Sequence, residues 1–496
     1  MPITKTLLRP NIIIIMSDQH NPHVMGCAGN NIILTPNLDA LAKKGMQFSP
    51  AYCPSPLCVP SRMSFMTSQY PSQIKVWTNE CALASDIPTM AHYLEAAGYE
   101  TVLCGRMHFV GPDQFHGFGK RILADVKNDL LSADILGQDR QRTNGQTKYA
   151  VQKAGYGRTG FSYYDQLVTN TACGYLENKA GGKDAKPFCL VIGMILPHNP
   201  LICKKEYFDY YYSRIAVNNY FTEKTVREMH PAVRAWCERR GVFDISPEQA
   251  HRALAAYYGL VTELDDNIGK IMNTVDRSCD PENTVIIYCS DHGDMAYENG
   301  LWWKSYFFEG SAGVPLIISG PGRFPAGKKI SSQVNLIDIG PTVLDMAQAG
   351  SMKNVAGKSF YRLLIEEENA QPWADEIFSE FPGLLGDLPS CMLKKKEWKL
   401  IYFHEFRAAE SSYLLFNLND DPEEKNDLSG DPRYRTIARD LLHDIKKRWS
   451  AEKILQELEK KKRDKITVFG PERYPHPLPE YIIPGDINEF NDNQLL

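Results

Sequence analysis

The chain has 496 residues, of which 43% are hydrophobic and 23% are charged, and its formal net charge is −5. These values are typical of a globular protein with a large core. Acids and bases are mixed along the chain, which argues against a nucleic-acid binder with a basic face. No segment approaches the ~18 apolar residues that span a membrane, so neither nucleic acid nor a membrane is an expected partner.

The first predicted element is a strand at residues 11–16, a continuous apolar run typical of a parallel strand buried on both faces. This run is too short for a signal peptide, so we expect a cytoplasmic protein, or a periplasmic one if a leader preceded this chain. Further elements are predicted from apolar residues that recur at the helical period, from proline near helix starts and from glycine after helix ends. They are helices at 35–44, 61–68, 87–97 and 249–275, and strands at 101–104, 188–195, 284–289 and 314–319.

Polar side chains follow four of the predicted strands directly. In chain order they are Asp18, then Arg106 and His108, then His198, then Asp291 and His292. In open α/β sheets, ligands bind outside the carboxyl ends of the strands. We therefore expect an α/β domain in which these distant residues converge on one site.

The pattern changes after about residue 370. Residues 394–402 and 413–418 resemble antiparallel strands, and an amphipathic helix follows at 434–448. This predicts an α/β domain at 1–374, a smaller α+β domain at 375–450 and an extended tail at 451–496. The tail is rich in Pro and Tyr beyond residue 465, and we expect it to pack on the body or on a neighbouring subunit, which leaves a homo-oligomer open.

None of the twelve cysteines forms a C-x-x-C pair, which argues against a zinc ribbon or a redox dithiol. Most are expected to pack as small hydrophobic residues. Cys58 differs, because it opens the string C-V-P-S-R immediately before a predicted helix.

C-x-P-S-R before a helix is the signature at which cysteine is oxidised to formylglycine, and here the chain resembles the sulfatase family of the alkaline-phosphatase-like superfamily. The resemblance extends over about residues 10–450. Its motifs occur in order: T-P-N-L-D-A-L at 35–41, C-V-P-S-R at 58–62, G-R-M-H at 105–108, P-H-N-P at 197–200, S-D-H-G-D at 290–294 and L-F-N-L-N-D-D-P-E-E at 415–424. It implies a large mixed sheet flanked by helices, a smaller C-terminal α+β domain, and a sulfuric ester hydrolase. The expected partners are a small sulfated substrate and a formylglycine-generating or anaerobic maturation enzyme that acts on Cys58.

Hydrolysis of a sulfate ester needs cations for the nonbridging oxygens, a strong nucleophile, and a proton for the leaving alkoxide. A hydrated formylglycine at position 58 would provide one hydroxyl to attack sulfur. The second hydroxyl would let the adduct expel sulfate and regenerate the aldehyde, an exit that serine lacks.

The expected metal ligands are Asp18, Gln19, Asp291 and His292, together with the modified Cys58. Carboxylate and amide oxygens suit Ca²⁺, with Mn²⁺ or Mg²⁺ as alternatives. Gln19 and His292 stand where many sulfatases have Asp and Asn, and in this they resemble the choline-sulfatase and phosphonate-hydrolase branches. A purely structural reading, in which Asp18 and Asp291 cap helices, is the alternative.

The resemblance implies roles for five further side chains. Arg62 is expected to orient the nucleophile, and Arg106, where the family usually has Lys, to bind sulfate. His108 is the expected base and His198 the expected general acid at the leaving oxygen. Lys304, in G-L-W-W-K, is expected to bind and neutralise the ester. The alternatives are structural histidines and a surface lysine, and no role is assigned to the remaining candidates, which are His20, His23 and His116.

Two features bear on the substrate. The stretches 109–118 and 300–316 resemble choline sulfatases, and aromatic residues there would either form a cage for a quaternary ammonium or pack in the core. These residues are Trp302, Trp303, Tyr306, Phe307 and Phe308. The insert at 121–187 is basic instead, which favours an anionic or hydroxylated leaving group; its basic residues include Arg140, Arg142, Lys148, Lys153 and Arg158. We therefore place a carbohydrate or small alkyl or aryl sulfate first and choline sulfate second. A phosphonate monoester or phosphodiester hydrolase and a non-catalytic sulfate-binding relative remain open.

Overall fold

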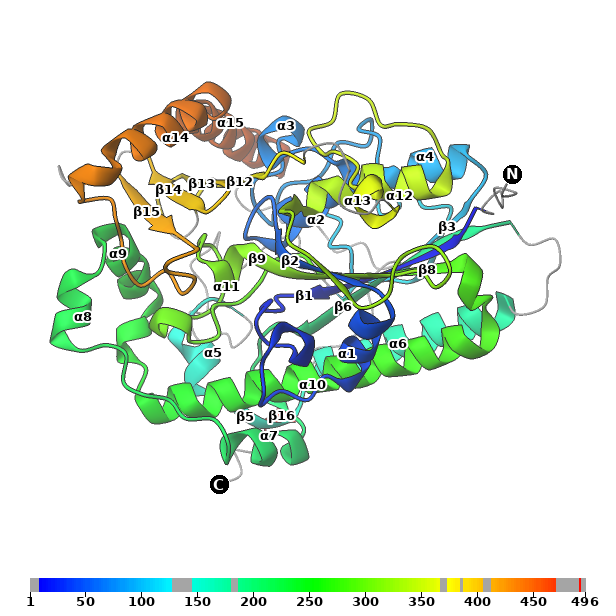
Figure 1. Cartoon of the computed structure of the whole chain (residues 1–496), viewed down its shortest axis with the longest axis horizontal. Coiled ribbons are helices and arrows are strands. Elements are labelled where there is room, and N and C mark those ends of the chain that lie inside the picture. Colours follow the sequence, from blue (N-terminus) through cyan, green and yellow to red (C-terminus); the bar gives the residue numbers. More distant parts are fainter. Residues whose placement is uncertain are drawn as a thin grey trace.

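The computed structural model describes residues 9–126, 145–179, 186–365, 373–383, 387–404, 412–469 and 490–491. Within these ranges the largest sheet has nine strands, in the order β10-β2-β9-β8-β1-β6-β3-β4 with β11 beside β2 (Figure 1). The strands are β1 (Asn11–Asp18), β2 (Met46–Tyr52), β3 (Glu100–Gly105), β4 (Lys120–Leu123), β6 (Phe188–Pro197), β8 (Thr284–Ser290), β9 (Gly313–Ser319), β10 (Lys328–Ile330) and β11 (Val334–Asn335).

Strand β1 lies at the centre of this sheet and pairs in parallel with both β6 and β8. Ile13 and Ile15 pack into the core on one face, whereas Ile12, Ile14 and Met16 pack into the core on the other. The alternation explains why the sequence of β1 is apolar at every position from 12 to 16. Strand β9 runs antiparallel to β8 and β2, so the sheet is mixed, as expected.

Helices cover both faces of the sheet (Figure 1). One face carries α1 (Pro36–Lys44), α6 (Gly160–Lys179) and α10 (Pro247–Ser278), and the other carries α2 (Cys58–Thr67), α4 (Met90–Ala96), α12 (Ile339–Ala347) and α13 (Tyr361–Ile365). The long helix α10 begins with a capping box, in which Ser246 accepts from the backbone of Gln249. The predicted strands and helices of this domain are confirmed, with two shifted starts. Helix α2 begins three residues earlier, at Cys58, with Pro60 in its first turn, and α4 begins three residues later, at Met90.

The remaining elements lie around this core. The helices are α3 (Pro71–Ile74), α5 (Lys148–Gln152), α7 (Lys205–Tyr212), α8 (Glu223–Glu228), α9 (Pro231–Arg240) and α11 (Glu309–Ala312). A small sheet joins β16 (Phe490–Asn491), β5 (Gly155–Arg158) and β7 (Ile202–Cys203).

A separate antiparallel sheet follows, ordered β12 (Glu376–Phe381), β13 (Ser390–Lys395), β14 (Trp398–Phe403) and β15 (Tyr413–Asn417), beside the helix α14 (Arg435–Arg448). The smaller C-terminal α+β unit is therefore present. The prediction of one strand at 394–402 was wrong, because a turn at Lys396, which has φ of 51°, divides this segment into β13 and β14.

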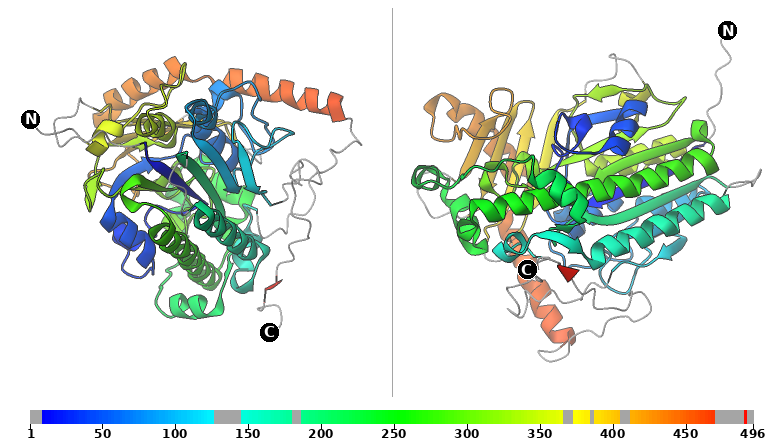
Figure 2. Two further views of the ribbon diagram at one scale, coloured as in Figure 1. Left: turned by 90° about the vertical axis from the view of Figure 1, so that its right-hand side faces the viewer. Right: turned by 90° about the horizontal axis from the view of Figure 1, so that it is seen from below.

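The prediction of an extended tail was wrong for residues 451–469, which form the helix α15 (Ala451–Phe469). Strong helix formers fill this segment, and Ile454 and Leu458 are spaced to share one helical face. In both views of Figure 2 the C-terminal end of this helix projects beyond the body of the protein, whereas Glu457 and Lys461 contact Lys75. Residues 470–489 and 492–496 lie outside the described part of the chain.

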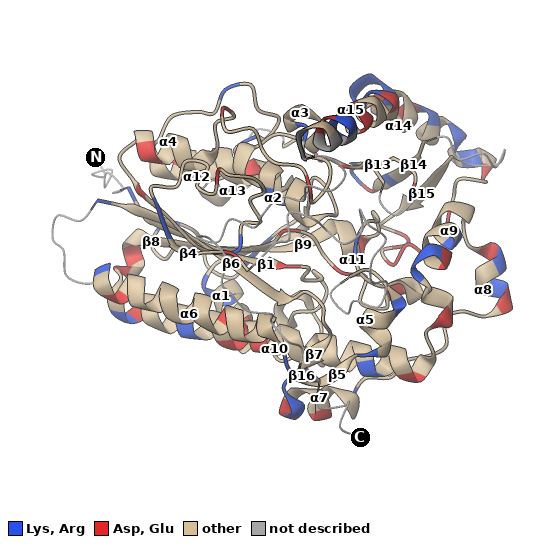
Figure 3. Cartoon of the chain, turned by 180° about the vertical axis from the view of Figure 1, so that it is seen from behind, with Lys and Arg blue, Asp and Glu red and all other residues tan. Residues whose placement is uncertain are grey.

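Charged residues of both signs are mixed along the outer helices α6, α8, α9, α14 and α15, whereas the central strands carry few (Figure 3). Among the described residues, no helix combines the length and the apolar character that crossing a bilayer requires.

Candidate active site

The carboxyl ends of the central strands bring together side chains that are far apart in the sequence. Asp18 ends β1, and Asp291 and His292 directly follow the adjacent strand β8. Arg106 follows β3, and the first turn of α2 presents Cys58. The expected convergence of strand ends on one site is confirmed for these residues.

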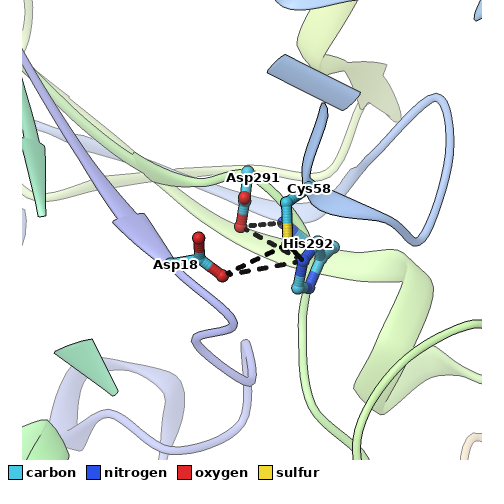
Figure 4. Close-up of side chains that lie close together, drawn as sticks. All are labelled: Asp18, Cys58, Asp291 and His292. Atoms are coloured by element: carbon cyan, nitrogen blue, oxygen red, sulfur yellow. Dashed lines mark hydrogen bonds and ion pairs between the residues drawn. The ribbon is translucent and has the colours of Figure 1, made fainter. Parts of the chain in front are cut away.

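Asp18, Cys58, Asp291 and His292 form a buried cluster in which one potential ligand atom from each residue lies within 4.8 Å of all the others (Figure 4). The Sγ atom of Cys58 is 3.2 Å from His292 Nε2 and 3.7 Å from Asp18 Oδ1. His292 Nδ1 lies 2.9 Å from the carbonyl oxygen of Gly293, which can only accept, so Nδ1 carries the proton. The Nε2 lone pair of His292 therefore faces the cluster, as metal ligation requires.

Gln19 adds an amide to this cluster. Its backbone N–H donates to Asp291 Oδ1 at 3.2 Å, and its φ is 69°. Its side-chain Nε2 donates to Asp294 and Asn199, whereas Oε1 is buried and has no hydrogen-bond partner in the described structure. A buried oxygen without a donor is costly unless something binds it. The two carboxylates and the imidazole of the cluster, with an unpartnered amide oxygen on the residue next to Asp18, are donor types that fit a divalent cation.

Two buried guanidinium groups neutralise the carboxylates. Arg62 Nε is 2.8 Å from Asp291 Oδ2, and its NH2 atom is 3.1 Å from Asp18 Oδ2. Arg106 Nε is 2.8 Å from the same Asp18 oxygen. Burial alone would raise the pKa of Asp18, but the charges of Arg106, Lys304, His198 and Arg62 outweigh it and lower the pKa well below its usual range. Asp18 is therefore ionised at neutral pH.

Lys304 lies directly beside the candidate nucleophile. Its Nζ is 2.9 Å from Cys58 Sγ and 3.9 Å from Asp18 Oδ1, and its side chain is 4% exposed, so the surface-lysine alternative is wrong. Its two neighbours, Trp303 and Ser305, have φ of 62° and 69°, a left-handed conformation that surrounding contacts must stabilise. The backbone N–H of Ser305 donates to Pro56, two residues before Cys58. These contacts direct Lys304 at the start of α2.

His108 is buried and neutral in this arrangement. Its Nδ1 lies 2.8 Å from an NH2 atom of Arg106, which can only donate, so Nδ1 accepts and Nε2 carries the proton. Burial and the charge of Arg106 lower the pKa of His108 well below its usual range. The expected role of His108 as a base needs the lone pair that Arg106 occupies here.

His198 is half-buried, and its charge acts on Asp18. Its Nδ1 lies 2.6 Å from the carbonyl oxygen of Asn199, and its ring packs edge-on against Phe161. The structure therefore leaves Nε2 of His198 as the ring atom that is available to a substrate.

Three residues that contact the site were not predicted from the sequence. Asp125 binds the backbone N–H of His108 at 2.8 Å, and Asp294 and Asn199 bind Gln19. Asp294 and Asn199 stand inside the S-D-H-G-D and P-H-N-P strings, which was a usable signal. Asp125 lies in the basic insert, and only the fold brings it to Arg106.

The structure describes most of the aromatic and basic residues that bear on the choice of substrate. All five aromatic residues of 300–316 are buried, and Trp303 and Tyr306 pack against Trp236, which supports the core-packing alternative. Lys148 binds Asp244 at 2.7 Å, and Lys153 and Arg158 are exposed. Arg140 and Arg142 lie outside the described residues.

Comparison with known proteins identifies relatives of this chain. The family described as Sulfatase matches residues 10–349, and the domain described as N-sulphoglucosamine sulphohydrolase, C-terminal, matches residues 297–451. A choline-sulfatase from Rhizobium meliloti is 34% identical to this chain, in an alignment that covers 86% of this chain and 83% of the choline-sulfatase. Arylsulfatase K from Danio rerio is 28% identical, in an alignment that covers 87% of this chain and 82% of the arylsulfatase.

Solved structures show the same fold. BT4656 in complex with its substrate D-glucosamine-2-N,6-O-disulfate aligns with a TM-score of 0.71 at 22% identity, over 88% of this chain and 97% of its own. The phosphonate monoester hydrolase of Agrobacterium radiobacter aligns with a TM-score of 0.71 at 21% identity, over 91% and 96%. The Sulfatase family matches more than half of the length of this chain. The chain therefore belongs to the sulfatase family and is a sulfuric ester hydrolase of the alkaline-phosphatase-like fold.

Proposed function

We propose that the chain hydrolyses an organic sulfate monoester to an alcohol and inorganic sulfate, through a formylglycine made from Cys58 beside a bound Ca²⁺. The observation that carries this proposal is the environment of Cys58. Its Sγ lies 2.9 Å from Lys304 Nζ and 3.2 Å from His292 Nε2, between two carboxylates. A buried structural cysteine would have apolar neighbours instead.

The donor set supports a cation at this site. Asp18, Asp291, His292 and the Oε1 atom of Gln19 would bind it, together with the modified residue 58. Hard oxygen donors favour Ca²⁺, and the imidazole leaves Mn²⁺ or Mg²⁺ as alternatives. A bound cation supplies positive charge for the nucleophile and for the sulfate oxygens.

A hydrated aldehyde at position 58 supplies one hydroxyl for attack on sulfur and a second for the later release of sulfate. Lys304, which contacts Cys58, would bind a nonbridging oxygen or the ester oxygen. His198, through Nε2, would give a proton to the leaving alkoxide. For His108 to act as the base, Arg106 must release Nδ1 and bind the sulfate group instead, so substrate binding would free the lone pair.

For the substrate, we propose a carbohydrate or small alkyl or aryl sulfate first. Choline sulfate is the second candidate, because a choline-sulfatase is 34% identical over most of both chains. The buried aromatic residues of 300–316 argue against a quaternary-ammonium cage built from them, since they pack in the core.

The test begins with the mass of the peptide that contains Cys58, expressed with a formylglycine-generating or anaerobic maturation enzyme. We expect a loss of about 18 Da, as the thiol is oxidised and its sulfur is replaced by an aldehyde oxygen. The converted protein is then assayed on sulfated monosaccharides, nitrophenyl sulfate, choline sulfate and a phosphodiester. Full conversion with no sulfate release, or faster phosphodiester cleavage, would contradict the proposal.

A further inference from the structure

The amide of Gln19 is oriented by two acceptors. Its Nε2 donates to Asp294 Oδ2 and, at 3.3 Å, to Asn199 Oδ1. The amide of Asn199 is oriented in turn, because its Nδ2 donates to the carbonyl oxygen of Gly145 at 3.1 Å. Both hydrogens of the Gln19 amide are therefore used, and Oε1 is the atom left without a partner.

The carboxylate of Asp294 is held in one orientation. Its other oxygen, Oδ1, accepts from the backbone N–H groups of Ala296 at 2.7 Å and Trp303 at 3.0 Å. Both oxygens thus accept from N–H groups, which fixes the carboxylate in place. The side chain is buried, so water does not compete for these bonds.

We propose that Asp294 is a positioning residue for the metal site: it binds the amide nitrogen of Gln19 and so directs Oε1 toward the cation. The proposal rests on the function proposed above, since it requires a cation at Asp18, Asp291 and His292. Partners that orient metal ligands in this way affect metal affinity without touching the ion.

The test is a charge exchange between positions 294 and 19. In Asp294→Asn, the side-chain oxygen of the new asparagine keeps the two backbone donors. The NH2 group of the asparagine then faces the NH2 group of Gln19. The Gln19 amide then turns over and presents nitrogen to the cation. We expect Ca²⁺ to bind about 10- to 100-fold more weakly.

Adding Gln19→Glu to Asp294→Asn restores a matched pair with the same total charge. A carboxylate at position 19 accepts from the new amide and offers its second oxygen to the cation. We expect the double variant to recover most of the lost affinity, whereas Gln19→Glu alone places two carboxylates against each other. The effects of the two substitutions on affinity would then not add, whereas two substitutions that merely damage the site would lower the affinity further in combination.

The readout is isothermal titration of the metal-free protein with CaCl2, with conversion at position 58 checked by mass. Asp338→Asn is the matched control, because Asp338 is another buried carboxylate that accepts backbone N–H groups, from Asn335 and Lys358, outside the site. Parent-like affinity in Asp294→Asn, equal losses in Asp294→Asn and Asp338→Asn, or no recovery in the double variant would overturn the positioning role alone. Absence of Ca²⁺ binding by the parent protein would overturn the calcium site of the proposed function as well.

Discussion

The thiol of Cys58 contacts charged groups, while the rest of α2 is buried among apolar and polar neighbours. We expect Cys58→Ala to abolish turnover and to leave the melting temperature nearly unchanged, since the other nine residues of the helix keep their packing. Steady-state sulfate release and a thermal melt measure the two effects. Cys189→Ala, at a buried cysteine on β6, is the matched control and should keep its activity. Substantial turnover by Cys58→Ala would reject the nucleophile assignment.

His198 is the candidate donor of the leaving-group proton. We expect His198→Ala to slow hydrolysis of alkyl sulfates about 10²- to 10⁴-fold, because an alkoxide leaves poorly without a proton. Nitrophenyl sulfate should be affected far less, since nitrophenolate leaves without one. Comparing kcat on the two esters checks the assignment, and equal losses would refute it.

The residues of the site could be predicted where a strand ends in polar residues, as at Asp18 and Asp291. The contacts between them could not. Arg62 was expected to orient the nucleophile, and in the structure its guanidinium binds the carboxylates of Asp18 and Asp291. Its role as orienting residue stays a prediction. The Arg106–His108 contact, which decides the tautomer of the histidine, depends on backbone geometry that spacing does not report.

At the scale of elements, long apolar runs such as β1 and long periodic helices such as α10 were predicted correctly. Strand β2 was missed, because it contains Pro50, and a proline within a run argues against a strand; its pairing with β9 shifts register between Phe48 and Ala51. Helix α6 was missed, because Gly, Asn and Thr residues weaken its apparent propensity while packing against α10 and β6 stabilises it. Tertiary contacts therefore decided the elements whose local signals were weak.

Strand β12 meets the catalytic domain at Glu380, which is 1% exposed. Its backbone N–H donates to Pro54, and its carboxylate accepts from the backbone of Ser72. Burial raises the pKa of Glu380 to about 7. Because this is above the unfolded value of about 4.3, the folded state holds the extra proton between the two, and stability falls as pH rises from about 4 to 7.

Replacing Glu380 with Gln removes this titration. We expect the parent to lose up to about 3 kcal/mol more than Glu380→Gln between pH 4.5 and pH 8, because each pKa unit corresponds to about 1.4 kcal/mol. Urea unfolding of both proteins across this range measures the difference. Identical pH slopes for the two proteins would contradict the raised pKa.

At the scale of the whole molecule, a buried ion network joins the smaller sheet to the catalytic domain. Lys399 on β14 lies 2.7 Å from Glu309 on α11 and 2.7 Å from Glu424, and its side chain is 0% exposed. Tyr52 on β2 donates to the second oxygen of Glu309 at 2.9 Å. Removing the ammonium would take away the cation that contacts both carboxylates and leave Lys394, whose charge also lowers the pKa of Glu309, as a remaining buried cation near them.

We therefore expect Lys399→Met to destabilise the protein by about 3–5 kcal/mol in urea unfolding. Lys395→Met is the control, because Lys395 also contacts two carboxylates, Glu376 and Asp444, but is 35% exposed. That variant should cost less than about 1 kcal/mol. Similar losses in both variants would show that burial does not govern this network.

If Cys58 is oxidised as proposed above, its burial also sets an order of events during protein synthesis. Cys58 is 1% exposed, and Asp291 and His292, which lie beside it, follow β8, so the maturation enzyme of the proposed function would have to reach it before β8 pairs with β1. About 220 residues separate the two segments, and at roughly 5–20 residues per second their synthesis takes about 10–45 s. Slower translation of this stretch should raise the converted fraction, measured by peptide mass, and the purified folded protein should resist conversion. Translation speed would then determine how many finished chains are active enzymes.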